Sequence, residues 1–294
     1  MATDGTAQAV ETQEGADAAR EDEKQAAVPA LMADKRGLVM GVANDHSIAW
    51  GIAQALHGHG AKLGFTYQGD AFGKRVKPLA ESIGSDLVVP CDVDNAQDLE
   101  ALFSVIEQQW GGLDFIVHAV AYSDKEELKG RYLDTTRSNF ARTMLVSCYS
   151  FTELARRAAP LMTNGGSLLT LTYLGAERVT PNYNVMGVAK AALEASVRYL
   201  ATDLGPNAIR VNAISAGPMR TLAGSAISDA RFVFGWSRTH APLRRSVALD
   251  EVGGSALYLL SDLSTGVTGE VHHVDCGYNI VGIPAPGRMD GDGT

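Results

Sequence analysis

The sequence has few cysteines, and their placement excludes a disulfide framework. Its 294 residues hold 3 cysteines, at Cys91, Cys148 and Cys276. They are far apart, odd in number and form no C-x-x-C pair, so we expect free thiols in a reducing compartment. None of the 7 histidines has H-E-x-x-H or zinc-finger spacing, so we also expect no metal site.

Long apolar runs and an excess of positive charge are missing as well. No stretch reaches the ~18 consecutive apolar residues that a membrane-spanning helix needs, so we expect no membrane span. The formal net charge of −9 argues against a nucleic-acid surface. Seven acidic and two basic residues fall within residues 1–30, so −5 of the −9 belongs to the N-terminal end.

The two ends of the chain differ from the rest in composition. Residues 1–34 are rich in Ala, Glu, Asp, Gln and Gly without apolar periodicity, and we predict a disordered acidic N-terminal tail. This segment has no apolar core and too many acids for a secretory or mitochondrial targeting peptide, which favours a cytoplasmic location. Residues 287–294 are predicted to be a disordered polar C-terminal tail, which leaves residues 35–286 as one domain.

Between these tails, short β-type runs alternate with helical patterns. Such alternation predicts an α/β fold, a Rossmann-type doubly wound parallel sheet in a single domain, with ligands at the carboxyl ends of the strands. The predicted strands are 37–42, 60–68, 86–93, 113–121, 167–172, 210–215 and 271–274. The main predicted helices are 48–56, 96–110, 140–159, 184–204 and 251–260.

One of these helices carries a tyrosine and a lysine at a useful spacing. Lys190 follows Tyr183 by seven residues, which is two helical turns with only ~20° of drift. The two side chains therefore share one face, about 10 Å apart along the axis, and both are long enough to reach one ligand. A nearby ammonium stabilises phenolate character and makes the tyrosine hydroxyl a better acid or hydrogen-bond donor. An amphipathic helix can also carry this pair by chance, so the surrounding residues must decide.

Those surrounding residues resemble a known family. Ordinary members of the short-chain dehydrogenase/reductase superfamily carry Tyr-x3-Lys with an upstream serine, whereas the position four after Tyr183 is Gly187. The motif here is Tyr-x6-Lys, with Tyr173 ten residues upstream, in the block YLGAERVTPNYNVMGVAK. From about residue 35 to about residue 284 the chain is similar to the divergent branch of that superfamily, the bacterial enoyl-[acyl-carrier-protein] reductases.

The resemblance implies a reaction and its partners. It implies reduction of the 2,3 double bond of an enoyl thioester on acyl carrier protein by NADH, the last step of fatty-acid elongation, in a cytoplasmic bacterial homotetramer. By the same match, Tyr183 donates a hydrogen bond to the thioester oxygen, and Lys190 holds the nicotinamide ribose. Tyr173 joins these two in the catalytic set and lines the acyl pocket. The implied substrate-binding set is completed by Ala121, Tyr122 and Met186.

The first strand leads into a loop and a helix that suit a phosphate group. Free amides and the helix dipole at the start of residues 48–56 favour an anion, and Ser47 is a predicted N-cap. The usual fingerprint has three clustered glycines, whereas only Gly41 and Gly51 remain here, so a plain strand–helix unit is an alternative. The family shows this stretched form, G-x5-S-x-A-x-G, which implies that Gly41, Ser47 and Ile48 line the cofactor phosphates and the nearby ribose.

The second strand ends at Gln68, which bears on the choice of cofactor. Glutamine can bond a ribose hydroxyl but cannot neutralise a 2′-phosphate, which favours NADH. Lys74 and Arg75 follow several residues later, either within reach of a phosphate or as solvated charges on the next helix. After the third strand, the resemblance implies that Asp92 and Val93 flank the adenine. For Asp92, an N-cap of the following helix is the alternative.

Two further loops complete the candidate site. At the end of the fourth strand, Ala119 and Ala121 are small enough for a ligand to approach the backbone closely. The implied cofactor set is completed by Ala119, Val120, Met219 and Thr221. Residues 220–243 combine small residues with Phe232, Phe234 and Trp236, which suits a lid over a lipid-like substrate. A surface helix pair packed on the core is the alternative.

Two other functions fit parts of this pattern. An ordinary short-chain carbonyl reductase or alcohol dehydrogenase needs Tyr-x3-Lys and a serine; Thr170 can replace the serine, but Gly187 stands in place of the lysine. A non-catalytic dinucleotide sensor would bind NADH without turnover, and the Tyr183/Lys190 pair argues against it.

Overall fold

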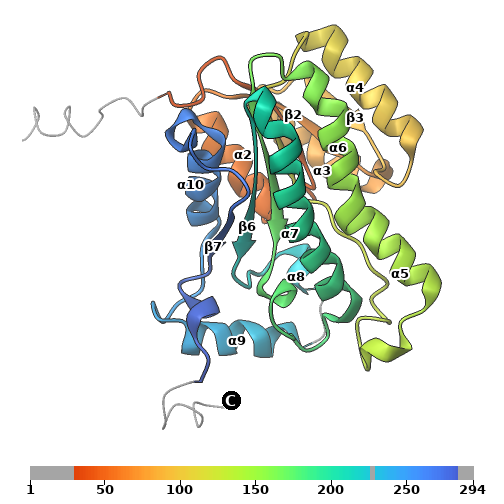
Figure 1. The fold of residues 1–294 in the computed structure, drawn as a ribbon, viewed down its shortest axis with the longest axis vertical. Helices are drawn as coiled ribbons and strands as arrows, with labels where there is room; N and C mark the ends of the chain where they lie inside the picture. Colours follow the sequence, from red (N-terminus) through yellow and green to blue (C-terminus); the bar gives the residue numbers. More distant parts are fainter. Residues whose placement is uncertain (1–29, 226–228, 284–294) are drawn as a thin grey trace, which may run out of the picture.

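The computed structural model describes residues 30–225 and 229–283 and contains one sheet of seven strands. Their order is β3-β2-β1-β4-β5-β6-β7, and all neighbours pair in parallel, which confirms the predicted doubly wound sheet (Figure 1). The strands are β1 (Arg36–Met40), β2 (Lys62–Tyr67), β3 (Leu87–Pro90), β4 (Phe115–His118), β5 (Gly166–Thr172), β6 (Ile209–Ala216) and β7 (Val271–Val274).

Helices cover both faces of this sheet. The apolar cluster on one face draws on α2, α3 and α10, and the cluster on the other face on α4, α6 and α7. The short helices α8 and α9 lie beyond the carboxyl ends of the strands, at the bottom of Figure 1. The helices are α2 (Ile48–Gly58), α3 (Gly69–Ser82), α4 (Ala96–Trp110), α5 (Arg137–Met144), α6 (Ser150–Ala158), α7 (Asn184–Leu204), α8 (Leu222–Ser225), α9 (Ala230–His240) and α10 (Leu249–Leu260).

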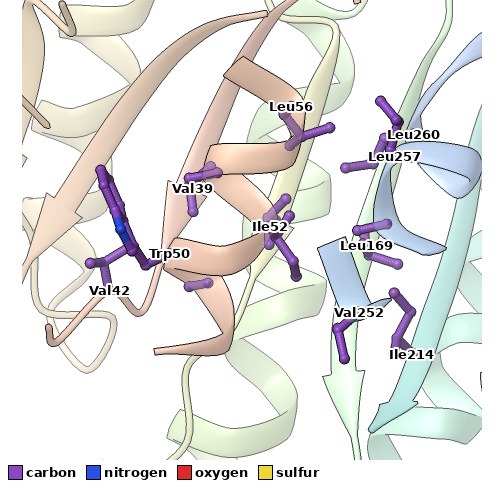
Figure 2. Packing of buried hydrophobic residues seen from close by; sticks show 14 of the residues in the cluster. Val39, Val42, Trp50, Ile52, Leu56, Leu169, Ile214, Val252, Leu257 and Leu260 are labelled. Carbon is purple, nitrogen blue, oxygen red and sulfur yellow. The ribbon is translucent and has the colours of Figure 1, made fainter. Parts of the chain in front are cut away.

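Successive residues of a strand enter opposite clusters. On β1, Leu38 and Met40 pack toward α4, α6 and α7, whereas Val39 packs toward α2 and α10. Figure 2 shows the cluster on the α2 and α10 side, in which Ile52 of α2 and Val252 of α10 are buried together with Val39, Leu169 and Ile214 of the sheet. Because both faces of the central strands β1 and β4 are buried, these two strands contain runs of consecutive apolar residues, Leu38–Met40 and Phe115–Val117, as is typical of a parallel sheet.

The structure changes several predicted boundaries. β1 ends at Met40 and β4 at His118, so the last residues of the predicted runs 37–42 and 113–121 are loops at the carboxyl edge. Asp92 and Val93 likewise follow β3 instead of belonging to it. At this edge the backbone has left the ladder, so its polar groups can face a ligand.

The predicted helix over residues 140–159 is interrupted. It begins at Arg137 as α5, passes through a π-helical turn, η2 (Leu145–Tyr149), and continues as α6. Apolar periodicity alone cannot reveal such a turn, because a π-turn inserts one residue without changing the composition of the helix.

The N-terminal boundary also moves. Residues 30–34 fall within the predicted tail, yet Met32 is fully buried and its amide donates to His59 O at 2.9 Å. The folded unit therefore includes Met32. The short apolar run Ala30–Ala33 was missed because it is too short to give a periodic signal. The predicted tail residues 1–29 and 287–294 lie outside the described residues.

The helix α7 has the limits that the sequence predicts. Tyr183 occupies the position before its first residue, and the helix ends before Gly205, where a short turn containing Pro206 follows. Within the described parts of the chain, no helix is both long and apolar enough to cross a membrane.

Candidate active site

The candidate residues gather where the sheet changes direction. β1 and β4 are neighbours, but the chain proceeds from β1 to β2 on one side and from β4 to β5 on the other. The chain therefore leaves β1 and β4 toward opposite sides of the sheet, and the carboxyl edge at such a point is the usual ligand position in these sheets. The predicted residues after β1, β3, β4, β5 and β6 all lie at this edge.

Two features of the backbone require glycine at position 41. Its φ is +96°, which side chains rarely adopt, and a Cβ at this position would lie 2.1 Å from Ala119 O. The loop after β1 thus runs directly against the loop after β4, which brings two predicted cofactor segments into contact. The helix α2 then begins at Ile48, where first-turn amides lack partners within the helix.

Ser47 holds this loop in a way that differs from the prediction. It is at the N-cap position of α2, but its side chain makes no cap hydrogen bond to the helix. Instead its hydroxyl oxygen accepts from the amides of Ala43 and Asn44 at 3.0 and 3.1 Å. Ser47 therefore has the predicted N-cap position, but its side chain does not cap the helix. It instead bonds the backbone of the loop that precedes the helix.

Two predicted adenosine-side residues contact each other. Gln68 Nε2 donates to Asp92 Oδ2 at 2.7 Å, across the neighbouring ends of β2 and β3. The alternative role of Asp92 as an N-cap is wrong, because Asn95 caps α4 by accepting from Gln97 N. Lys74 and Arg75 are exposed on α3, as the solvated-charge interpretation predicts.

The buried Tyr183 and the partly buried Tyr173 form one aromatic pair. Their ring centroids are 5.2 Å apart at an interplanar angle of 74°, an edge-to-face arrangement. Gly175 packs on the Tyr183 ring, since a Cβ there would lie 2.4 Å from a ring carbon. Met186 is buried in the same cluster, with Leu128 from the loop after β4. Three of the predicted catalytic and substrate residues are therefore together.

Burial governs the acidity of both tyrosines. Burial raises the pKa of Tyr183 well above its ordinary value, with smaller contributions from Tyr173 and Glu194. Burial likewise raises the pKa of Tyr173 to about 12. Burial thus dominates the acidity of Tyr183, which keeps its proton, and its role as a hydrogen-bond donor to a ligand stays a prediction.

Lys190 is buried on the second turn of α7. Its ammonium donates to Leu171 O on β5 at 2.8 Å, and its side chain has little exposure. Burial lowers its pKa to about 8, against smaller raising effects of Cys148 and Glu194. The ammonium has spare donors after this one bond, so it can also bind hydroxyl groups of a ligand.

The position of Gly187 excludes the superfamily's ordinary arrangement. A Cβ on Gly187 would lie 2.7 Å from Gly175 O, so a lysine has no room there without moving the turn that packs on Tyr183. The alternative of an ordinary short-chain carbonyl reductase is therefore not supported.

The helix α9 lies between two cavities. One of about 520 Å³ is lined by residues that include His46, Met219 and Thr221, together with Arg220, Arg231 and Arg238. The other, of about 340 Å³, is lined by residues that include Tyr173, Pro181, Phe232, Trp236 and Tyr278. On α9, Arg231 and Arg238 thus line the first cavity together with Phe234, whereas Phe232 and Trp236 line the second. Sequence reasoning did not single out the arginines, because spacing on a short helix does not tell which face meets a cavity.

Some predicted residues are less enclosed. Ala121 and Tyr122 are exposed, and the guanidinium of Arg142 lies 4.6 Å from the centroid of the Tyr122 ring. Val93 is buried. Part of the predicted lid, residues 226–228, lies outside the described residues.

The described residues contain no cluster of three or more His, Cys, Asp or Glu side chains that could hold a metal ion. The three cysteines are free and buried, as predicted.

Comparison with known proteins gives consistent results. A family model described as Enoyl-(Acyl carrier protein) reductase matches residues 41–279. An "Enoyl-[acyl-carrier-protein] reductase [NADH] 2" of Rhizobium meliloti (strain 1021) is 65% identical over 254 residues, 86% of this chain and 95% of the relative. The crystal structure of an enoyl-(acyl-carrier-protein) reductase from Anaplasma phagocytophilum with NAD is 60% identical, with a TM-score of 0.85, covering 88% of this chain and 98% of that one. The structure of FabI from Candidatus Liberibacter asiaticus is 58% identical, with a TM-score of 0.86, covering 88% and 100%.

Proposed function

The chain belongs to the enoyl-(acyl carrier protein) reductase family, and from this membership we propose the roles of its residues in NADH-dependent reduction of enoyl thioesters. The reaction reduces the 2,3 double bond of an enoyl group carried on acyl carrier protein, the last step of fatty-acid elongation. NADH supplies a hydride to the β-carbon, and the α-carbon takes a proton, so each turnover consumes one NADH and one proton.

The residues at the carboxyl edge fit a dinucleotide. At Gly41 the loop after β1 packs so closely on Ala119 O that no side chain fits, which holds the two loops together next to the start of α2, where a helix favours an anion. Gly41, Ser47 and Ile48 hold the phosphate side, and the Gln68–Asp92 pair holds the adenosine. The pair adds a carboxylate and no cation near the ribose, which favours NADH over a cofactor with a 2′-phosphate. This cofactor-binding set is completed by the Thr221 hydroxyl and by the backbone of four residues: Val93, Ala119, Val120 and Met219.

Tyr183 acts on the thioester oxygen. Negative charge collects on that oxygen as the hydride arrives, and a hydrogen bond donated by the neutral hydroxyl stabilises it where it develops. The raised pKa of Tyr183 suits this role, because the group keeps its proton at neutral pH. Lys190 holds the nicotinamide ribose hydroxyls and supplies positive potential beside the developing charge.

The acyl chain lies on the tyrosine side of α9. Tyr173 separates Tyr183 from the cavity of about 340 Å³, whose aromatic walls suit a hydrocarbon chain. Met186, Ala121 and Tyr122 border the thioester end. Residues 220–243, which include α9, cover the substrate as a lid.

Assembly and location follow from the family. We propose a homotetramer that works in the cytoplasm of a bacterium and receives its substrate on acyl carrier protein. The large apolar side chains exposed on η2 and α7 support assembly, because a monomer rarely leaves such a set uncovered. They include Leu145, Tyr149, Val188 and Tyr199. The tails, residues 1–34 and 287–294, are proposed to lie outside the catalytic domain, apart from the buried Met32 region.

The joint burial of Tyr183 and Lys190 beside Tyr173 is the observation that carries this proposal. The test is oxidation of NADH and of NADPH with crotonyl thioester and, separately, with acetoacetyl thioester. We expect turnover of crotonyl thioester with NADH. Reduction of the keto thioester alone would assign an ordinary carbonyl reductase, and binding of NADH without either turnover would assign a sensor.

A further inference from the structure

The π-turn η2 carries buried hydroxyl groups that the proposed function does not use. Ser147 is fully buried within it, and Ser150, the first residue of α6, is 1% exposed. Hydroxyl groups removed from water must find partners inside the protein, and π-turns are frequent at functional sites. The partners of these two serines lie at the carboxyl end of β4.

Ser147 makes two hydrogen bonds to the backbone of one residue. Its hydroxyl donates to Tyr122 O at 2.9 Å, and its oxygen accepts from Tyr122 N at 2.9 Å. A side chain that bonds both polar groups of one residue fixes the peptide planes on either side of it. Tyr122 directly follows Ala119–Ala121, the segment proposed to border the cofactor and the thioester.

Ser150 reaches the other end of that segment through His118. Its backbone N–H donates to Leu145 O, five residues earlier, which is the π-type bond. Its hydroxyl donates to Val146 O at 2.7 Å, which uses its only proton. Ser150 Oγ therefore accepts from His118 Nε2, 2.9 Å away.

These bonds determine the form of the His118 ring. Because Nε2 carries the proton and the ring is neutral, Nδ1 is an acceptor for the Thr170 hydroxyl, which lies 2.9 Å from Nδ1 and 3.2 Å from His118 O and shares its one proton between them. Burial, followed by the charge of Lys190, lowers the pKa of His118 to about 3, which agrees with a neutral ring. Both ring nitrogens of His118 thus have partners, on α6 and on β5, and such networks hold their members in one arrangement.

The same loop is tied to the residue after Tyr183. Asn184 Nδ2 donates to Glu127 O and Gly130 O, both at 3.3 Å. Asn184 has a φ of +35°, a strained value for a side-chain-bearing residue that the surrounding bonds must maintain. The position of Tyr183 and the course of the loop after β4 are therefore set together.

We infer that Ser147 and Ser150 are positioning residues for the reductase reaction: by holding Tyr122 and His118 they fix both ends of the Ala119–Ala121 segment. This inference rests on the proposed function, because the segment matters for catalysis only if nicotinamide and thioester meet beside it. Hydride transfer is sensitive to small displacements of the groups that orient the reactants.

The test compares Ser147→Ala with Ser167→Ala. Ser167 is a matched control, because it is also buried and its hydroxyl donates to a backbone carbonyl, Leu259 O at 3.0 Å, near the amino end of β5 and away from the carboxyl edge. For each variant we would measure kcat with crotonyl thioester at saturating NADH and the primary isotope effect with NADH deuterated at the transferred position. NADH affinity and thermal stability would be measured alongside. We expect Ser147→Ala to lower kcat by about tenfold and to raise the isotope effect, with NADH affinity unchanged. Ser167→Ala should stay within about twofold of the unsubstituted enzyme in kcat.

A normal kcat and isotope effect in Ser147→Ala would overturn the inference, as would a loss of activity that only follows the fraction of folded protein. If Ser147→Ala does not fold, Ser147→Cys decides, because it keeps the shape and weakens the hydrogen bonds; the same two readouts apply. Ser150→Ala should act in the same direction through His118. If the unsubstituted enzyme turns over no enoyl thioester, the proposed function fails; if it does and the variants match it, only this inference fails.

Discussion

Tyr183 shows how strongly burial can change the acidity of one side chain. Its ring is enclosed by Tyr173 and Gly175, and its hydroxyl keeps its proton because the ionised form is poorly solvated there. A group of this kind stabilises developing charge by donating a hydrogen bond, and does not need to ionise.

The first prediction therefore concerns that hydroxyl. Tyr183→Phe should lower turnover of an enoyl thioester by about 100-fold or more, the range for loss of one donor to a developing oxyanion. NADH affinity should change little, since the ring and its packing remain. Steady-state kinetics and a fluorescence titration with NADH check this, and unchanged turnover would remove Tyr183 from the mechanism.

Lys190 is a charged residue inside the protein, and its charge has a cost. Its pKa is lowered by burial from 10.5 to about 8, which corresponds to about 3 kcal/mol that disfavours the charged folded state at neutral pH. Between about pH 8 and 10.5 the folded protein has lost this proton while the unfolded chain retains it. The contribution of Lys190 to the unfolding free energy therefore rises with pH across this window and is least favourable below it.

The second prediction follows from this rise of stability with pH. Lys190→Met should abolish turnover, yet in the ligand-free protein at pH 7 it should be no less stable than the unsubstituted chain. The stability difference between the two should move in favour of the unsubstituted chain as the pH rises from 7 to about 10. Urea unfolding at both pH values checks this. A strongly destabilised Lys190→Met at pH 7 would contradict it and would mean that the bond to Leu171 O outweighs the cost of burial.

At the scale of elements, the loop after β1 and the loop after β4 contact each other at Gly41. Gly41→Ala should lower the unfolding free energy by about 2 kcal/mol or more and weaken NADH binding, because of its positive φ and the short distance to Ala119 O. Gly58→Ala is the control on the same helix unit: a Cβ there meets no atom within 4 Å, and we expect a gain of about 0.5 kcal/mol. Denaturant unfolding and NADH titration of both variants are the measurement. Equal effects of the two substitutions would contradict the close contact between the loops after β1 and β4.

Elements also show what the sequence could and could not predict. The α7 limits and the pair Tyr183/Lys190 were predictable, because helix spacing and the Gly-Pro stop are local signals. The Gln68–Asp92 bond was not, because it depends on β2 and β3 being neighbours in the sheet. The η2 turn was also missed, because the i to i+5 hydrogen bonds of a π-turn cannot be recognised from the spacing of apolar residues. Local motifs could be recognised in the sequence, whereas contacts that depend on the order of the strands became visible only in the folded structure.

At the scale of the whole molecule, exposed apolar side chains on η2 and α7 predict assembly. The proposed homotetramer should have a mass of roughly 124 kDa, four times the 31.1 kDa of one chain. Size-exclusion chromatography with light scattering measures this mass directly. Tyr199→Glu and Tyr149→Glu, which place charge on the exposed face, should lower it, whereas Lys74→Glu on α3 should not. A mass of one chain for the unsubstituted protein would contradict the proposal.

The helix α9 forms a wall of both cavities: Arg231, Phe234 and Arg238 line one, and Phe232 and Trp236 line the other. A displacement of this helix toward one cavity would enlarge the other. If the first cavity takes the nucleotide and the second the acyl chain, as proposed, a bulky substitution on either face of α9 should alter the binding of both ligands.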